Sequence, residues 1–240
     1  MRRRTKYGEI RAAEAPPSQR FTALAGKLDA VGALSDQTYE ELRRSLETTG
    51  ELYTVDMLLG SVVSRSMEVV DSFLTAFEHW SVGVASALVR LQIDNVLRCH
   101  LIAVTPEPDL LYQHLASDLP LRKLALPERL ANALPSDQRK RARRHEDWVL
   151  VALAAQEHDW IESAYAISSA WVHHSSAHLL TSYKIDGNRL SGRVPTATAQ
   201  FDEQFLTPIV DVMGAATRTI VNHLNEWTAR KMRLKAAPEA

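Results

Sequence analysis

The sequence predicts an all-α protein, a multi-helix bundle of about seven helices with one short β-hairpin near residues 183–194. Apolar residues recur at helical spacing along most of the chain, and proline or glycine marks the ends of these stretches. One segment, around Asp186-Gly187-Asn188, instead alternates as two strands joined by a tight turn do. The 45% hydrophobic and 24% charged residues are typical of a globular domain and exclude a disordered chain.

The first half of the chain begins with a flexible basic tail over residues 1–17, which ends in two prolines. The expected helices that follow cover residues 18–35, 36–50, 51–80 and 81–104. The last of these is apolar nearly all round, so we expect it at the centre of the bundle.

The second half opens with a proline-rich insertion or cover over residues 106–135. Beyond it we expect a long helix over 136–157, a second over 159–180, the hairpin, and a final helix over 198–232 that Pro208 kinks or restarts. Residues 233–240 are expected to be a disordered tail. Residues 18–232 thus form a single helical domain.

Charge is unevenly distributed in a chain of net charge −1. Residues 1–20 hold six basic and two acidic residues, and residues 136–145 hold five basic and one acidic. Two basic patches on an otherwise acidic body favour RNA or another anionic ligand as a partner. Exposed apolar helix faces would favour a homo-oligomer.

The single cysteine, Cys99, cannot form an intramolecular disulfide, which fits a cytoplasmic protein. No apolar run reaches the length of a membrane span. The sequence also lacks GxGxxG, GxxxxGK[ST], GxSxG, CxxC and HExxH, so dinucleotide enzymes, nucleotide triphosphatases, serine hydrolases and zinc fingers are unsupported. No cofactor is predicted.

Charged residues within the most apolar helix are the first candidate site. Arg90, Asp94 and Arg98 are spaced i, i+4 and i+8, so they share one helix face. Buried charges are costly unless they are paired. The three residues therefore form either an internal ion network that fixes helix register or a site for an anion.

The helix expected over 159–180 carries the second half of the candidate site. Its polar side chains are Tyr165, Ser169, His173, His174, Ser175 and His178. Lys184 and Arg193 of the hairpin region could cover this site and bind an anionic ligand.

Three interpretations of these histidines stay open. His174 and His178 are one turn apart and could bind a metal, with a carboxylate from Asp94, Asp159 or Glu162 as third ligand. One histidine could instead act as a general base beside Arg90 or Arg98 on a phosphodiester. Or the histidines are hydrogen-bonded structural residues.

The segments LVRLQIDNVLR and SAYAISSAWVHHSSAHLL resemble a diffuse group of uncharacterised bacterial all-helical proteins. The resemblance covers roughly residues 50–185, and its matched positions are Arg90, Asp94, Tyr165, Ser169, His173 and Ser175. Some of these proteins are similar to the HEPN superfamily, whose ribonuclease members carry an R-x4-6-H motif. Arg139 and His145 satisfy that spacing, although Lys140 replaces the usual polar residue after the arginine.

The resemblance implies an RNA-directed, toxin-like or phage-defence protein, cleaving RNA without a metal if it is an enzyme. The catalytic candidates are Arg90, Asp94, Arg98, Tyr165, His173 and His178, together with Arg139 and His145. The ligand-binding candidates are Ser169, Ser175, Lys184 and Arg193. Two alternatives remain: a non-enzymatic oligomeric binding or scaffold module, and a metal-dependent helical enzyme.

Overall fold

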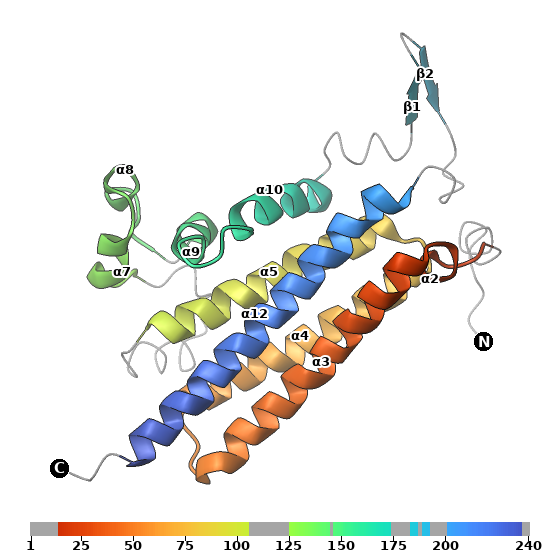
Figure 1. Ribbon diagram of the computed structural model, residues 1–240. Helices are drawn as coiled ribbons and strands as arrows, with labels where there is room; N and C mark the ends of the chain where they lie inside the picture. The colour runs from red at the N-terminus through yellow and green to blue at the C-terminus, as the bar shows by residue number, and fades with distance from the viewer. Residues whose placement is uncertain are drawn as a thin grey trace.

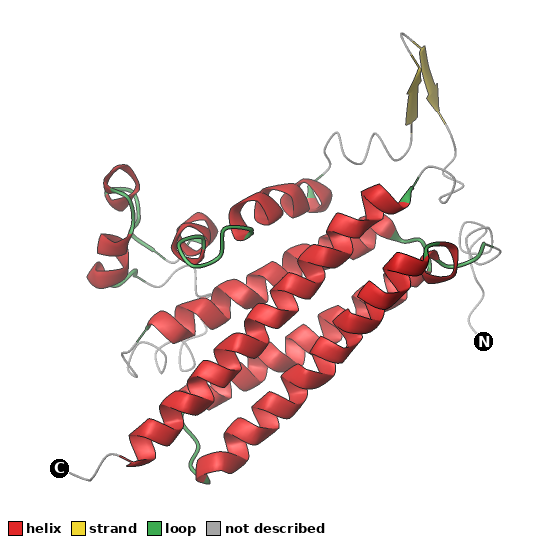
Figure 2. Ribbon diagram, viewed as in Figure 1, coloured by secondary structure: helices red, strands yellow, loops and turns green. Residues whose placement is uncertain are grey.

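The protein is an all-α helical bundle, as the sequence predicts (Figures 1 and 2). A computed structural model describes residues 14–105, 125–144, 146–173, 183–186, 189–192 and 201–236. The short helices are α2 (Pro17–Arg20), α7 (Glu128–Ala133), α8 (Ser136–Arg139), α9 (Asp147–Ala154) and α10 (Ile161–Val172). The long helices are α3 (Thr22–Thr49), α4 (Thr54–Glu78), α5 (Val82–Val104) and α12 (Glu203–Ala236).

The four long helices form the core of the fold. Helix α12 packs along α3 and α5, and α4 also packs along α3 and α5, which closes a four-helix arrangement. Helices α9 and α10 add a layer on the other side of α5 (Figure 1). Helix α5 therefore has neighbours on nearly every side, which explains its continuous apolar sequence and confirms its predicted central position.

Several predicted helix boundaries are wrong, including the end of the helix expected over 159–180, which stops at Val172. The helices expected over 18–35 and 36–50 are one helix, α3, which continues through Ser35 and Asp36 because its whole length packs against its neighbours. The helix expected over 136–157 is broken between α8 and α9. There the backbone N–H of Leu126 donates to the carbonyl of Arg143 at 3.1 Å, and Ala125 bridges Arg144, so the chain is held in an extended form.

The last helix begins later and ends later than the sequence indicates. Pro208 lies inside α12 without dividing it, because it is near the first turn and removes only one backbone hydrogen bond. The helix continues past Met232 to Ala236, so residues 233–236 are helical and not part of a disordered tail.

The predicted hairpin is confirmed. Strand β1 (Tyr183–Asp186) pairs antiparallel with β2 (Arg189–Gly192), with Tyr183 opposite Gly192 and Asp186 opposite Arg189. No helix in the described residues has the length and apolar character that crossing a membrane requires.

A buried ion pair fixes one end of α12 against the connection between α3 and α4. The Lys231 ammonium lies 3.0 Å from a carboxylate oxygen of Asp56, and both side chains are fully buried. Lys231 also donates to the backbone carbonyls of Ser45, at 2.9 Å, and Glu51, at 3.2 Å. The indole N–H of Trp227 donates to the other oxygen of Asp56 at 2.7 Å, so every strong polar group of this pair is satisfied.

Candidate metal centre

Three histidines from three separate segments meet beside α5. His100 lies on α5, His223 lies on α12, and His158 lies in the connection between α9 and α10. Their ring centroids are 5.9 to 6.4 Å apart, and one potential ligand atom from each lies within 4.8 Å of the others. His100 and His223 are buried and His158 is partly buried, so the cluster is at the edge of the core.

Each of these imidazoles leaves a buried ring nitrogen without a hydrogen-bond partner among the described residues. The three atoms are Nδ1 of His100, Nε2 of His158 and Nε2 of His223. Burial lowers the pKa of His100 to about 4, although Glu157 opposes the shift, and burial also lowers the pKa of His223. The rings of His100 and His223 are therefore neutral at neutral pH, the form that carries a lone pair for a metal ion.

Two carboxylates flank the cluster. Nδ1 of His223 lies 3.4 Å from Oε2 of Glu226. Because a carboxylate only accepts, Nδ1 carries the proton and Nε2 keeps its lone pair. Oε2 of Glu157 lies 3.6 Å from Nδ1 of His100, and this glutamate side chain is 58% exposed to solvent. Glu226 thus orients the His223 ring, and both carboxylates stand at the solvent edge of the cluster.

The arrangement fits a zinc-class ion after small side-chain movements. Tetrahedral Zn²⁺ with imidazole bonds of about 2.0–2.1 Å needs ligand atoms about 3.4 Å apart. The present separations of up to 4.8 Å would have to contract by up to about 1.4 Å. The backbone on both sides of His158 is fixed, since its N–H donates to Ala154 and its carbonyl accepts from Ile161.

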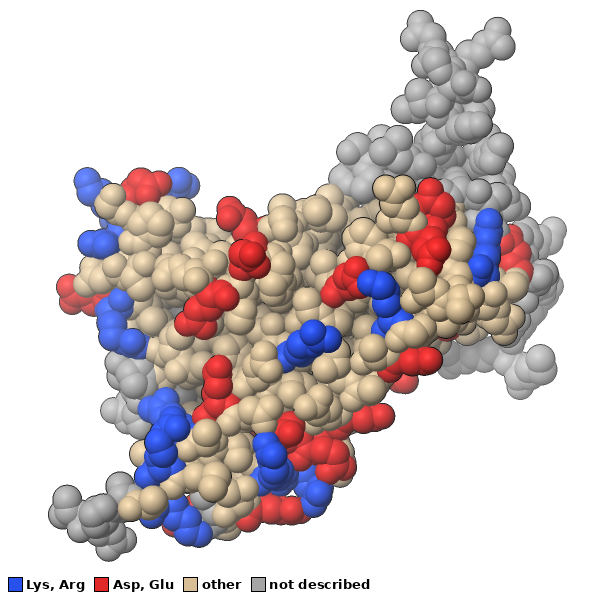
Figure 3. Space-filling model, in the orientation of Figure 1, with Lys and Arg blue, Asp and Glu red and all other residues tan. Residues whose placement is uncertain are grey.

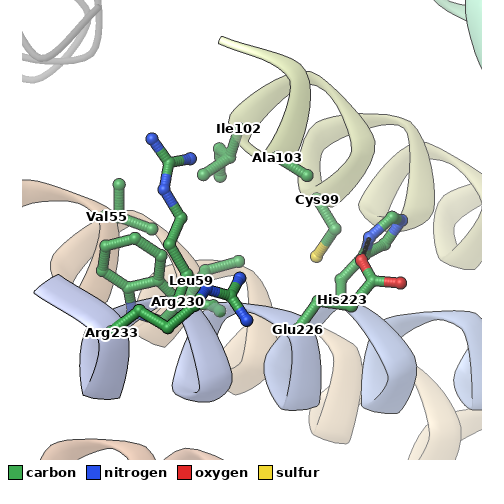
Figure 4. Close-up of a pocket in the computed structure, with 10 residues that line it drawn as sticks. Val55, Leu59, Cys99, Ile102, Ala103, His223, Glu226, Arg230 and Arg233 are labelled. Atoms are coloured by element: carbon green, nitrogen blue, oxygen red, sulfur yellow. Dashed lines mark hydrogen bonds and ion pairs between the residues drawn. The ribbon is translucent and has the colours of Figure 1, made fainter. Parts of the chain in front are cut away.

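A cavity of about 170 Å³ adjoins the cluster between α4, α5 and α12 (Figure 4). His223 and Glu226 line it at one end together with Cys99, whereas Arg230 and Arg233 lie toward the other end (Figure 4). Complete burial raises the pKa of the Cys99 thiol to about 12, so this cysteine is neutral and behaves as a small apolar residue.

The predicted pairing of Arg90 and Asp94 with Tyr165 and Ser169 is present in the structure. Arg90 forms an ion pair with Asp94, and its Nε donates to the Ser169 hydroxyl at 3.1 Å. Its NH2 donates to the Tyr165 hydroxyl at 2.6 Å, and the guanidinium carbon lies 3.9 Å from the centre of the tyrosine ring. Asp147 of α9, which the sequence analysis did not identify, completes the network 3.3 Å from NH2 of Arg90.

This Arg90 network joins α5, α9 and α10 and satisfies its own charges. Burial is the largest single influence on the pKa of Arg90 and lowers it, but the bond to Asp94 and the charges of Asp94, Tyr165 and Asp147 together outweigh burial and leave the pKa raised. Arg98, one turn beyond Asp94, is partly buried, and burial lowers its pKa. The geometry favours the interpretation of an internal ion network, and a catalytic role of these residues stays a prediction.

The other candidates fall outside this network. His173 follows the last residue of α10 in extended backbone and is exposed, so it does not continue the face of Tyr165 and Ser169. Arg139 donates to the carbonyls of Asn132 and Leu134 at the end of α7. The remaining candidates, His145, His174, Ser175, His178 and Arg193 and the side chain of Lys184, lie outside what the structure describes.

Sequence reasoning missed the histidine cluster. His100, His158 and His223 each stand alone in different segments, with no short-range spacing to join them. The available signal was weak: one histidine in the most apolar helix, and two others each next to or near a glutamate. Only the packing of α5, α12 and the α9–α10 connection brings them together.

Comparison with known proteins adds nothing to this geometry. No family model matches the chain, and neither the curated proteins nor the solved structures contain a significant match.

Proposed function

We propose that the protein is a metal-dependent enzyme that binds one zinc-class divalent ion through His100, His158 and His223. The observation that carries the proposal is the convergence of three imidazoles, one ring nitrogen of each within 4.8 Å of the others, and each ring also has a buried nitrogen without a hydrogen-bond partner among the described residues. A buried polar atom without a partner is costly, and native proteins keep such atoms rarely. A shared metal ion would satisfy all three at once.

A catalytic use of the ion is supported by the number of protein ligands. Structural zinc sites are closed by four protein ligands, whereas catalytic sites have three and leave one position to water or substrate. Here three imidazoles are available, and the cavity lined by His223 lies next to them. A zinc-bound water ionises near neutral pH, which would supply a hydroxide nucleophile. Glu157 stands where it could accept the proton from that water.

Metal analysis of the purified chain tests the proposal directly. After chelation and reconstitution with Zn²⁺, elemental analysis should find one ion per folded chain, and Co²⁺ should give the visible absorption of a tetrahedral site. His158→Ala should weaken binding at least ~100-fold, since loss of even an indirect partner costs 10- to 100-fold. His158 suits the test because it is only partly buried.

The matched control is His79→Ala, which removes an exposed histidine whose Nδ1 bonds to the carbonyl of Thr75 in its own helical turn. This variant should keep the wild-type stoichiometry. Circular dichroism would show that both variants are folded. A folded wild-type chain that binds no Zn²⁺ or Co²⁺ overturns the proposal, and so does a His158→Ala variant with unchanged affinity.

An RNA-directed function is a second candidate, favoured by the exposed basic residues between α8 and α9. Arg139, Lys140, Arg141, Arg143 and Arg144 are all exposed, and basic side chains gather over α7 and α8 in Figure 3. Incubating the protein with total RNA, with and without a chelator, distinguishes metal-independent from metal-dependent cleavage. Cleavage that survives the chelator supports the metal-independent hypothesis, whereas cleavage lost with the chelator assigns the activity to the histidine centre. Intact RNA in both lanes counts against this candidate.

A further inference from the structure

The cavity beside the histidine cluster has two chemically different parts. Its apolar wall is formed by Val55, Leu59, Ile102, Ala103 and Trp227. Its polar groups are divided along α12, with His223 and Glu226 at one end and Arg230 and Arg233 toward the other (Figure 4). A ligand that matches this lining has an apolar body and one charged end.

The two arginines supply positive charge that no carboxylate of the described residues neutralises. Neither Arg230 nor Arg233 forms an ion pair within that part of the chain. The Arg230 guanidinium carbon lies 5.9 Å from the centre of the Trp227 ring, so it stands beside the apolar wall. A guanidinium recognises carboxylate and phosphate groups through two parallel N–H bonds.

The position of the charges along α12 sets the orientation of the ligand in the cavity. His223, Glu226, Trp227, Arg230 and Arg233 follow helical spacing, which places them along one side of α12. At 1.5 Å of rise per residue, Arg230 lies about 10 Å along the helix axis from His223. Glu226, at the histidine end, is the one acidic residue of the lining, so in the chain without metal the two guanidiniums attract the anionic group to the arginine end. The rest of the ligand then extends toward His223.

The volume limits the size of the ligand. A buried cavity of about 150 Å³ accommodates a benzene ring. The present cavity, of about 170 Å³, therefore has room for a body of about that size, with the charged group reaching toward the arginines.

We propose that this cavity binds a small apolar oxyanion, a carboxylate or phosphate ester with a body about the size of a benzene ring, as the substrate of the histidine centre. The oxyanion binds Arg230 and Arg233, the body lies against Trp227, and the reactive group lies beside His223. This inference rests on the proposed function for its chemistry, since a metal at the histidines would act on the group beside it. The binding step itself depends only on the cavity.

Calorimetric titration of the full chain with benzoate and phenyl phosphate, each with and without Zn²⁺, tests the inference. Both anions should bind the wild type more tightly than phenol, their neutral analogue, and the better of the two identifies the charged group. Arg230→Gln should weaken binding of the better anion about tenfold, the cost of one charge-assisted interaction. Arg218→Gln, an exposed arginine on α12 outside the cavity, is the matched control and should bind as the wild type does.

The outcomes separate this inference from the proposed function. Anion binding that depends on Arg230 in a chain without metal affinity keeps the cavity as a binding site and overturns only the metal centre. Zn²⁺ binding without any anion binding overturns the substrate class and leaves the metal centre. Anions that bind no better than phenol, or equally well to an Arg230→Gln/Arg233→Gln chain, also overturn the inference.

Discussion

Replacing Lys231 by methionine should lower the free energy of unfolding by about 3–5 kcal/mol, because it leaves a buried carboxylate without its counter-charge. Lys231 and Asp56 are both completely buried and 3.0 Å apart. The change also removes the donor to the carbonyls of Ser45 and Glu51. Methionine fills most of the lysine volume, so the expected loss is electrostatic and not a cavity effect.

The size of the effect can be measured by urea denaturation and by heat. At about 2.1 cal/mol/K per residue, a chain of 240 residues loses about 8 °C of Tm for 4 kcal/mol. The matched control is Lys27→Met, which breaks the exposed ion pair with Asp211 and should cost no more than about 1 kcal/mol.

A second variant tests the cause of the loss. Adding Asp56→Asn to Lys231→Met removes the unpaired charge and keeps an oxygen for the Trp227 indole, so it should restore part of the stability. If Lys231→Met unfolds within 1 kcal/mol of the wild type, or if the double variant is less stable than the single one, the reasoning about this ion pair is wrong.

Three further predictions concern the polar groups around α5. In chelated protein, the His100 pKa of about 4 lies below the unfolded value of about 6.5, so only the unfolded state gains a proton between these pH values. The free energy of unfolding should thus fall by about 3 kcal/mol as the pH drops from 6.5 to 4. A free energy from urea denaturation that stays constant over this pH range would contradict the prediction. Tyr165→Phe removes the hydroxyl between Arg90 and Asp147 and should lower the free energy of unfolding by about 1 kcal/mol in the same assay. An unchanged free energy of unfolding would show that the hydroxyl does not contribute to the network. Cys99, fully buried with a pKa near 12, should resist iodoacetamide at pH 8 until urea unfolds the chain, and rapid alkylation of the native protein would refute its burial.

The parts of the fold that sequence predicts well are those in which local pattern and packing agree. The helix observed over 82–104 is apolar over most of its surface because it contacts neighbours on nearly every side, so its sequence already shows its position. The sequence predicts two helices where α3 is a single one, because Ser35 and Asp36 resemble the start of a helix. The sequence does not predict the break between α8 and α9. This break comes from pairing with residues 125 and 126, and helical periodicity carries no information about such pairing.

The same distinction explains the candidate sites. Arg90 with Asp94, and Tyr165 with Ser169, are i, i+4 pairs, so each half of their network is visible within one helix. The histidine cluster has no such halves, since each of its members comes from a different segment. A site assembled only by tertiary packing gives a single sequence almost no signal.

The two polar clusters connect the same layer to the bundle, but they differ in whether their atoms are satisfied. In the first, Arg90 of α5 bonds to Asp147 of α9 and Tyr165 of α10, and every one of these groups has a partner. In the second, His158 reaches His100 and His223 from between α9 and α10, and all three rings keep an unpartnered nitrogen within the described chain. A satisfied network needs nothing further to hold the helices together. The unsatisfied one has three unpartnered ring nitrogens, a carboxylate at its solvent edge and a cavity beside it, so its polar atoms are available to a ligand while those around Arg90 are already used.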